Sequence, residues 1–289
     1  MTAFATRLYA AVGAEEARFP CCDTEFYVRA EGRGASRAVE RAREVARDLE
    51  SQLNAFDASS AVAELNESGR VENAHVARVV ERGLEYRERT EGAFDVRQGA
   101  VEHRVKAYIR GDRDDPGAAP FGDGEVAVSG DVVTADCVVD LNGLAKGYLV
   151  DRTAEAAAGP GRRVMVDGGG DVAHPTGPVG IESPYGGREL RVLDVAETAH
   201  VATSGRYRRT RGTVDHVYDP TSERRGGRNE LATVVAERDA TEADALATVL
   251  VALGVEDGLA LVESWPGVEA FVLADGTFHE TEGFDAHVA

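Results

Sequence analysis

Short β-branched runs and longer amphipathic runs are grouped along this 289-residue chain instead of alternating one by one. Strict alternation of strand and helix is typical of a parallel sheet with helices on both faces, whereas grouping is typical of the α+β class. The sequence therefore predicts an α+β fold. Its length allows one large core or two modest ones, so one two-lobed domain and two domains are both compatible with it.

Three long patterns predict helices in the first part of the chain. Apolar residues three and four positions apart between Val39 and Leu53 predict one helix, with Ser36 as its N-cap. A similar pattern predicts a helix over residues 75–90, and a third helix is expected over residues 143–158, before a Gly-Pro-Gly stop.

Valine-rich and alternating segments predict the strands. Residues 125–141 contain the turn sequence SGD and are expected to form a hairpin, and the preceding residues 110–125 are expected to form a surface loop. Two more helices are predicted over residues 240–253 and 256–265. The remaining predicted strands are residues 24–32, 163–168, 178–182, 189–195, 200–205, 213–219, 231–237 and 268–275.

Composition excludes several classes of partner. The 51 acidic and 32 basic residues give a formal charge of −19, which repels nucleic acid and anionic lipid. Lysine occurs only at Lys106 and Lys146, and we interpret the acidic, arginine-rich composition as an adaptation to high salt. No run approaches the roughly 20 apolar residues of a membrane span, and no secretory signal is recognisable, so we expect a cytoplasmic protein. The three cysteines match neither a zinc spacing nor a disulfide framework, which favours a reducing compartment.

The sequence DLNGLAKG, residues 140–147, is a candidate phosphate site. We expect Asp140 at the end of a strand, Gly143 at a turn and Lys146 in the first turn of the following helix. A helix N-terminus with a lysine suits a phosphate group. The stretch is neither a dinucleotide fingerprint nor a P-loop, however, and the alternative is an ordinary turn with a solvated lysine.

The sequence TEADALAT, residues 241–248, is a candidate metal site. Asp244 and Thr248 are four residues apart on a predicted helix, so their oxygens lie on one face. A carboxylate and a hydroxyl are hard ligands that suit Mg²⁺. The alternative is structural, because Thr241 and Asp244 also match a capping box.

The stretch TSGRYRRTRGTVDHVYDP, residues 203–220, contains His216 in a predicted strand. A histidine can act as a general acid or base, although a lone histidine is more often simply packed. Four arginines nearby can attract a phosphorylated substrate or balance carboxylates. These arginines are Arg206, Arg208, Arg209 and Arg211.

Two further stretches contain glycines. The glycines in GAFDV, residues 92–96, and VDGGGDVA, residues 166–173, permit either close ligand approach or tight turns.

In this order, the stretches GAFD, DLNGLAKGY, GGGD, SGRY, HVYDP and ADALAT resemble the FAD:protein FMN transferases of the ApbE family, over about residues 24–272. The resemblance implies a single two-lobed domain over residues 21–280, with mixed or antiparallel sheets and flanking helices, between an N-terminal extension, 1–20, and a C-terminal tail, 281–289. It implies Mg²⁺-dependent cleavage of FAD, transfer of FMN to a threonine or serine of an acceptor flavoprotein through a phosphoester bond, and release of AMP.

The resemblance also implies site residues. The metal ligands are the main-chain carbonyl of Gly143, Asp244 and Thr248, and His216 is the candidate catalytic acid or base. The residues implied to bind the flavin substrate are Cys22, Phe56, Ala93, Phe94, Asp95, Asp140, Lys146 and Tyr218.

The chain departs from the family pattern at several of these positions. Cys22 and Asp23 replace a Met-Gly pair, Phe56 replaces a tyrosine, and Ala247 replaces an aspartate found in some members. A Mg²⁺-dependent FAD diphosphatase and a non-catalytic flavin-binding protein are therefore the alternatives. The sequence identifies neither the acceptor nor the oligomeric state.

Overall fold

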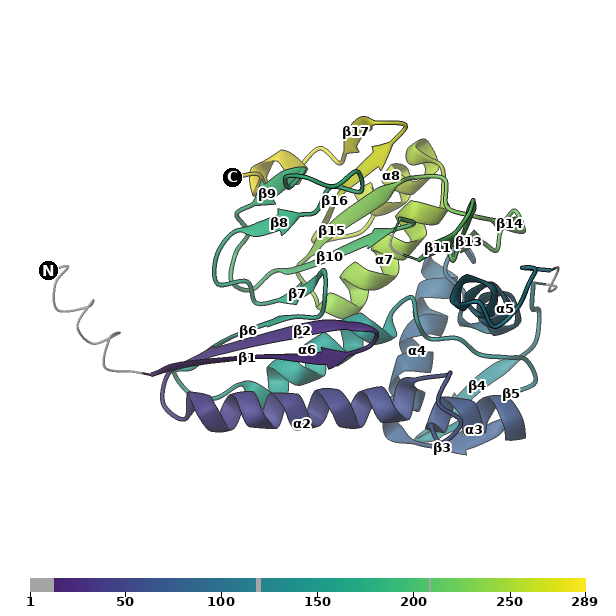
Figure 1. Cartoon of the computed structure of the whole chain (residues 1–289), viewed down its shortest axis with the longest axis horizontal. Coiled ribbons are helices and arrows are strands. Elements are labelled where there is room, and N and C mark those ends of the chain that lie inside the picture. Colours follow the sequence, from purple (N-terminus) through teal and green to yellow (C-terminus); the bar gives the residue numbers. More distant parts are fainter. Residues whose placement is uncertain (1–12, 118–120, 208) are drawn as a thin grey trace, which may run out of the picture.

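A computed structural model describes residues 13–117, 121–207 and 209–289 (Figure 1). Its centre is an eight-stranded sheet in which every pair of neighbouring strands is antiparallel. The strands, in their order across the sheet, are β1 (Ala14–Cys21), β2 (Thr24–Glu31), β6 (Arg163–Asp167), β7 (Asp171–Ala173), β10 (His200–Gly205), β15 (Leu231–Ala236), β16 (Val268–Ala274) and β17 (Thr277–Glu280).

The described residues form four smaller sheets besides this one. The predicted hairpin forms as β4 (Val126–Ser129) and β5 (Val132–Ala135), and β3 (Arg70–Glu72) pairs with β5. The other three sheets are two-stranded, namely β8 (Val179–Ile181) with β9 (Arg191–Leu193), β11 (Thr210–Arg211) with β12 (Val214–Asp215), and β13 (Tyr218–Asp219) with β14 (Arg224–Arg225).

The predicted helices form close to their expected bounds, and α3 and α5 are additional. The helices are α2 (Ala35–Leu53), α3 (Ala61–Ser68), α4 (Ala74–Arg89), α5 (Gly99–Arg110), α6 (Ala145–Ala157), α7 (Ala240–Ala252) and α8 (Val255–Glu263), with short 3₁₀ helices η1 (Val96–Gln98) and η2 (Phe284–His287). Together with the antiparallel sheets, they confirm the α+β prediction.

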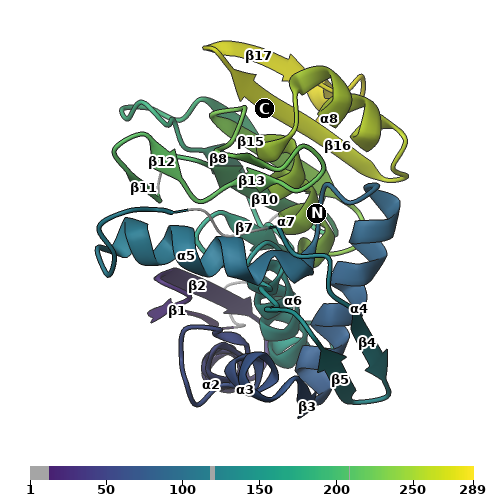
Figure 2. The same ribbon diagram turned by 90° about the vertical axis from the view of Figure 1, so that its right-hand side faces the viewer.

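Hydrophobic packing covers both faces of the large sheet. Helices α2, α6 and α7 pack on one face, where they share the larger core with alternate residues of β2, β6 and β15 (Figure 1). The opposite face carries a smaller core that includes Ile181, Leu193 and Phe284, from the β8–β9 hairpin and the C-terminal residues. Figure 2 shows α5 crossing the side of the molecule between α2 and the β11–β12 hairpin. This position lets α5 form one wall of the candidate site.

Two predicted caps are wrong. Helix α2 begins after Gly34, which has a left-handed conformation, and Ser36 lies inside the helix, where its hydroxyl donates to Glu15 at 3.1 Å. Helix α7 is capped by Asp239, which accepts from the main-chain N–H of Glu242 at 2.8 Å. Thr241 instead donates to Asp151. The capping-box interpretation of Thr241 and Asp244 is therefore wrong, and Asp244 is left for another role.

Asp140 and His216 lie outside strands, contrary to prediction, because side chains take the place of a strand partner. The main chain of Val139 is bonded in both directions to the amide of Asn66, at 2.7 and 2.9 Å, and Asp140 accepts from the N–H of Asn142 at 2.8 Å. His216 lies at a bend between β12 and β13, where Asp215 accepts from the N–H of Val217 at 2.9 Å.

The fold extends past the expected domain bounds on both sides. Residues 14–20, expected in an N-terminal extension, form most of β1 in the large sheet. At the other end, Phe284 is buried and the N–H of Ala289 donates to Val192 at 2.9 Å. Among the described helices, none combines the length and the apolar character needed to cross a membrane.

Candidate active site

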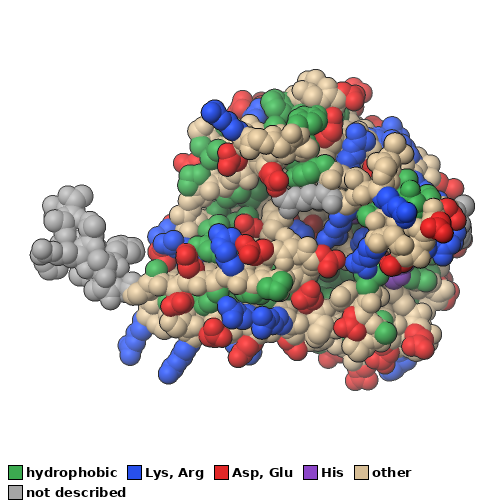
Figure 3. All heavy atoms as spheres, viewed as in Figure 1, with side chains coloured by type: hydrophobic (Ala, Val, Ile, Leu, Met, Phe, Trp, Pro, Cys, Tyr) green, Lys and Arg blue, Asp and Glu red, His purple; other side chains and the backbone are tan. Residues whose placement is uncertain are grey.

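A cavity of about 890 Å³ lies where α5, the N-terminal end of α6, α7 and the tip of the β1–β2 hairpin meet. All twelve candidate residues line it, although they come from segments between positions 22 and 248. Acidic and basic side chains are intermixed on the outer face of the molecule drawn in Figure 3, rather than gathered in one patch of a single sign.

Gly143, Asp244 and Thr248 lie together on one side of the cavity. A Cβ atom on Gly143 would be 2.9 Å from the ring of Phe94 and 3.5 Å from the methyl group of Thr248, so a side chain there would require the Phe94 ring to move. Asp244 accepts from the N–H of Gly147, in the first turn of α6, at 2.9 Å. The Thr248 hydroxyl lies 3.4 Å from that of Ser204 on β10.

The close approach of α6 to α7 depends on Gly147. A Cβ atom there would be 2.3 Å from the carbonyl oxygen of Ala240, the first residue of α7. The carboxylate of Asp151, one turn further along α6, accepts from the N–H groups of Ala240 and Thr241 at 2.8 and 2.9 Å. The first half of α6 is thus joined to the first turn of α7.

Lys146 does not point freely at solvent, because its ammonium group forms an ion pair with Asp171. The other oxygen of Asp171, Oδ1, is buried and has no hydrogen-bond partner among the described residues. Asp171 and Asp244 are only 1% and 3% exposed. Burial, and next the charge of Asp171, raises the pKa of Asp244 to about 8. Two buried carboxyl groups beside one ammonium group leave an excess of potential negative charge, which suits a divalent cation.

A second charged cluster lies on the α5 side of the cavity. Lys106 pairs with Glu102 one turn earlier, and His103 lies 3.2 Å from the carboxylate of Asp140. Burial opposes the charge on Asp140, but Lys106 and His103 outweigh it and lower its pKa. Sequence reasoning missed Lys106 and Glu102 because no helix was predicted there. The rarity of lysine was an available signal, since both lysines of the chain line the cavity.

His216 lines the cavity near the second charged cluster. Its Nδ1 atom is buried without a hydrogen-bond partner among the described residues. Burial, followed by the charges of Lys106 and Arg209, lowers the pKa of His216 to about 3. The imidazole is therefore neutral near pH 7 and can accept a proton.

The candidate flavin-binding residues share the cavity but differ in how free they are. The carboxylate of Asp95 is bound by Arg97 at 2.7 Å and caps η1, so its role is at least partly structural. The ring of Phe56 has the guanidinium of Arg110 at 4.2 Å from its centroid. Burial, followed by the charges of Glu102 and Asp140, raises the pKa of Tyr218 well above its usual value.

The arginine cluster predicted around residue 208 separates in three dimensions. The structure describes three of the four arginines, and of these three only Arg209 lines the cavity. Arg206 donates to the carbonyl of Gly227 at 3.2 Å, and Arg211 donates to that of Tyr108 at 2.9 Å. Arg208 lies outside the described residues.

Comparison with known proteins gives matches over most of the chain. The chain is 29% identical over 167 residues to the FAD:protein FMN transferase of Treponema pallidum, which covers 50% of this chain and 46% of that protein. It is 27% identical over 213 residues to the protein of the same name from Vibrio cholerae, covering 64% and 63%. The chain thus spans about half to just under two thirds of these curated relatives.

Solved structures agree in fold over nearly the full length. The flavin transferase ApbE from Vibrio cholerae has a TM-score of 0.77 at 21% identity, covering 96% of this chain and 99% of that one. The ApbE protein of Thermotoga maritima has a TM-score of 0.83 at 21% identity, covering 96% and 100%. The profile of the ApbE family matches residues 22–272. The chain therefore belongs to the ApbE family.

Proposed function

We propose that this protein cleaves the pyrophosphate of FAD and transfers the FMN part to a threonine or serine hydroxyl of an acceptor flavoprotein, releasing AMP. The observation that carries the proposal is the meeting of Gly143, Asp244, Thr248, Lys146 and His216 in one cavity. Two curated relatives named FAD:protein FMN transferase support the same activity. We expect a cytoplasmic enzyme that works at high salt, on account of the charge of −19.

Asp244, Thr248 and the main-chain oxygen of Gly143 would hold Mg²⁺. These are hard oxygen ligands, and Mg²⁺ commonly completes its shell with water and substrate phosphate. When bound, the ion supplies positive charge that offsets the negative charge of a pyrophosphate. The residues fit this role, because Asp171 and Asp244 carry two potential negative charges against the single positive charge of Lys146. A pyrophosphate would otherwise be repelled.

The proposed reaction forms one bond and breaks one. The oxygen of the acceptor hydroxyl attacks the phosphorus atom of the FMN half, and the bond from this phosphorus to the bridging oxygen breaks. AMP leaves with the bridging oxygen. The proton of the hydroxyl passes to the neutral imidazole of His216. A bound pyrophosphate would offset the charges of Lys106 and Arg209, which raises the pKa of His216 toward the working range of a base.

The outcome depends on what fills the acceptor position. A peptide that covers the cavity excludes water and leads to transfer, whereas water in the same position gives FMN and AMP. We favour transfer, because the named relatives are transferases.

The test is to incubate the protein with FAD and Mg²⁺ in high salt, with and without an acceptor protein. AMP is followed by chromatography and covalent flavin by in-gel fluorescence. AMP and a fluorescent adduct that both need the acceptor support transfer. AMP released at full rate without an acceptor favours the diphosphatase. FAD that binds and stays intact with every acceptor overturns the proposal in favour of a non-catalytic flavin-binding protein.

A further inference from the structure

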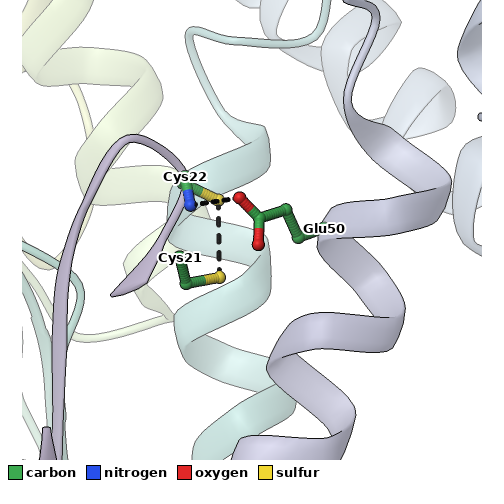
Figure 4. Close-up of side chains that lie close together, drawn as sticks. All are labelled: Cys21, Cys22 and Glu50. Atoms are coloured by element: carbon green, nitrogen blue, oxygen red, sulfur yellow. Dashed lines mark hydrogen bonds between the residues drawn. The ribbon is translucent and has the colours of Figure 1, made fainter. Parts of the chain in front are cut away.

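The tip of the β1–β2 hairpin brings together two thiols and a carboxylate. Cys21 and Cys22 are adjacent, and their sulfur atoms are 3.8 Å apart. Glu50 reaches them from α2, and Figure 4 shows its carboxylate beside Cys22. One ligand atom from each of the three residues lies within 4.8 Å of the others. Sequence spacing gave no hint of this, because the third group is 28 residues away on another element.

The turn holds this arrangement in place. Cys22 and Asp23 both have left-handed conformations, with φ of 55° and 56°, and form the two-residue turn between β1 and β2. The N–H of Cys22 donates to Glu50 at 2.6 Å. The remaining lone pairs of that carboxylate stay available to a ligand. Cys21 is buried, whereas Cys22 and Glu50 line the cavity.

The geometry fits a tetrahedral ion. Two sulfur atoms, each about 2.3 Å from a tetrahedral Zn²⁺, are about 3.8 Å apart, which is the spacing found between Cys21 and Cys22. A disulfide fits less well, because the Cα atoms of adjacent residues are about 3.8 Å apart and ordinary disulfides need about 4.4 to 6.8 Å. We propose that Cys21, Cys22 and Glu50 form a Zn²⁺ site whose fourth coordination position faces the cavity.

The ligand set selects the class of metal. Two thiolates disfavour Mg²⁺ and Ca²⁺, which take oxygen ligands, and the carboxylate disfavours purely soft ions such as Cu⁺. The site differs in this respect from the all-oxygen set around Asp244, so the two can be filled independently. Three protein ligands leave one position for water or for a group bound in the cavity.

The binding test uses the full-length protein, reduced with a phosphine and held in excess Mg²⁺ so that oxygen sites are occupied. Zn²⁺ is titrated against a chromophoric chelator, and Co²⁺ serves as a spectroscopic probe. We expect one Zn²⁺ per chain, release of about two protons, and a thiolate-to-Co²⁺ charge-transfer band.

The variants Cys22→Ser and Glu50→Gln are expected to weaken Zn²⁺ binding at least about tenfold, and Cys22→Ser should also weaken the charge-transfer band. Glu50→Gln keeps an acceptor for the N–H of Cys22, so the turn is preserved. Cys137→Ser is the matched control, because Cys137 is the third free thiol and lies elsewhere. Absence of the charge-transfer band, or equal affinity in wild type and Cys22→Ser, would overturn the proposal.

A second measurement tests whether the fourth coordination position of the Zn²⁺ site faces the cavity. This measurement rests on the proposed function, because it uses FAD as the ligand. Because Cys22 and Glu50 line the cavity, Zn²⁺ should weaken FAD binding to the wild type but not to Cys22→Ser, as followed by quenching of flavin fluorescence. Unchanged FAD affinity in zinc-loaded wild type contradicts a cavity-facing site. If FAD fails to bind without zinc, the proposed function fails while the zinc stoichiometry stands.

Discussion

Replacing Lys146 with methionine separates two roles that this residue can have. Its ammonium group lines the cavity, where it can face a phosphate, but it also pairs with the buried carboxylate of Asp171. Methionine keeps most of the length and the apolar stem while removing the charge. If the pair is important to folding, the variant must lose stability even in the absence of FAD.

The expected loss follows from burial. The side chains of Lys146 and Asp171 are 22% and 1% exposed, so the pair is mostly shielded from water. Removing one partner of a buried pair costs about 3 to 5 kcal/mol, since the other charge is left uncompensated. Because the lysine end reaches the cavity, we expect about 3 kcal/mol. Adding Asp171→Asn removes the stranded charge, so the double variant should regain about 1 to 2 kcal/mol.

The assay is urea unfolding in high salt, without FAD or divalent ions, for the wild type, both single variants and the double variant. Arg18→Met is the control. Arg18 forms an ion pair with Glu25, with 2.9 Å between the guanidinium nitrogen and the carboxylate oxygen, and both side chains are exposed. Loss of this pair should leave stability almost unchanged, because water screens exposed ion pairs. The double variant should remain inactive, because stability returns without the positive charge.

A loss below about 1 kcal/mol for Lys146→Met would refute the reasoning, because it would place the pair in the range of surface ion pairs. Additive effects of Lys146→Met and Asp171→Asn would refute it as well, since residues that interact directly must be coupled in the double variant. In either case Lys146 would be a solvated lysine, the alternative that its sequence motif left open.

Three further predictions concern single residues. His216→Gln should bind FAD normally but release AMP about 10² to 10⁴ times more slowly in steady-state assays, and a loss below tenfold would remove His216 from proton transfer. Asp244→Asn should abolish Mg²⁺-dependent turnover of FAD while the circular dichroism spectrum of the variant stays native, and an unfolded variant would show that the role of Asp244 is structural. For His200, burial and then the charge of His174 lower the pKa to about 4. As the pH falls, His200 is therefore protonated in the unfolded chain before it is protonated in the folded protein. Stability that is present above about pH 6.5 is lost between pH 6.5 and 4, by up to about 3 kcal/mol. His200→Gln should flatten this part of the denaturation profile, and an unchanged slope would contradict the assignment.

Much of the fold could be predicted from the sequence where a pattern reflects a single buried face. Alternation in β2 and the apolar stripe of α2 are of this kind, because each element packs its apolar face on the same core. Helix α5 was missed because its apolar stripe is interrupted by Glu102 and Lys106, which are buried as a pair. A search for hydrophobic periodicity assigns charged residues to the surface. Glu102 and Lys106 are nevertheless buried, because each neutralises the charge of the other.

The motifs predict which segments contribute to the candidate site, but they do not predict which of these segments contact each other. The DLNGLAKG and TEADALAT motifs each predict a local arrangement, but neither predicts that the N–H of Gly147 meets the carboxylate of Asp244, 97 residues later in the chain. The errors at Asp140 and His216 have the same origin. In both places a side chain from outside the segment, or a carboxylate next to it, satisfies main-chain groups that a strand partner would otherwise take.

Helices α6 and α7 both line the cavity and are fixed to each other, so they form its floor, whereas loops form its rim. Gly147 and Asp151 join the two helices in the absence of any ligand, so the proposed site for a cation and a diphosphate would not need to be assembled at each turnover. The rim consists of loops and short hairpins around residues 54–56 and 209–217, which contribute few residues to the core. Changes in the rim can therefore alter which acceptor docks, while the floor keeps the same chemistry.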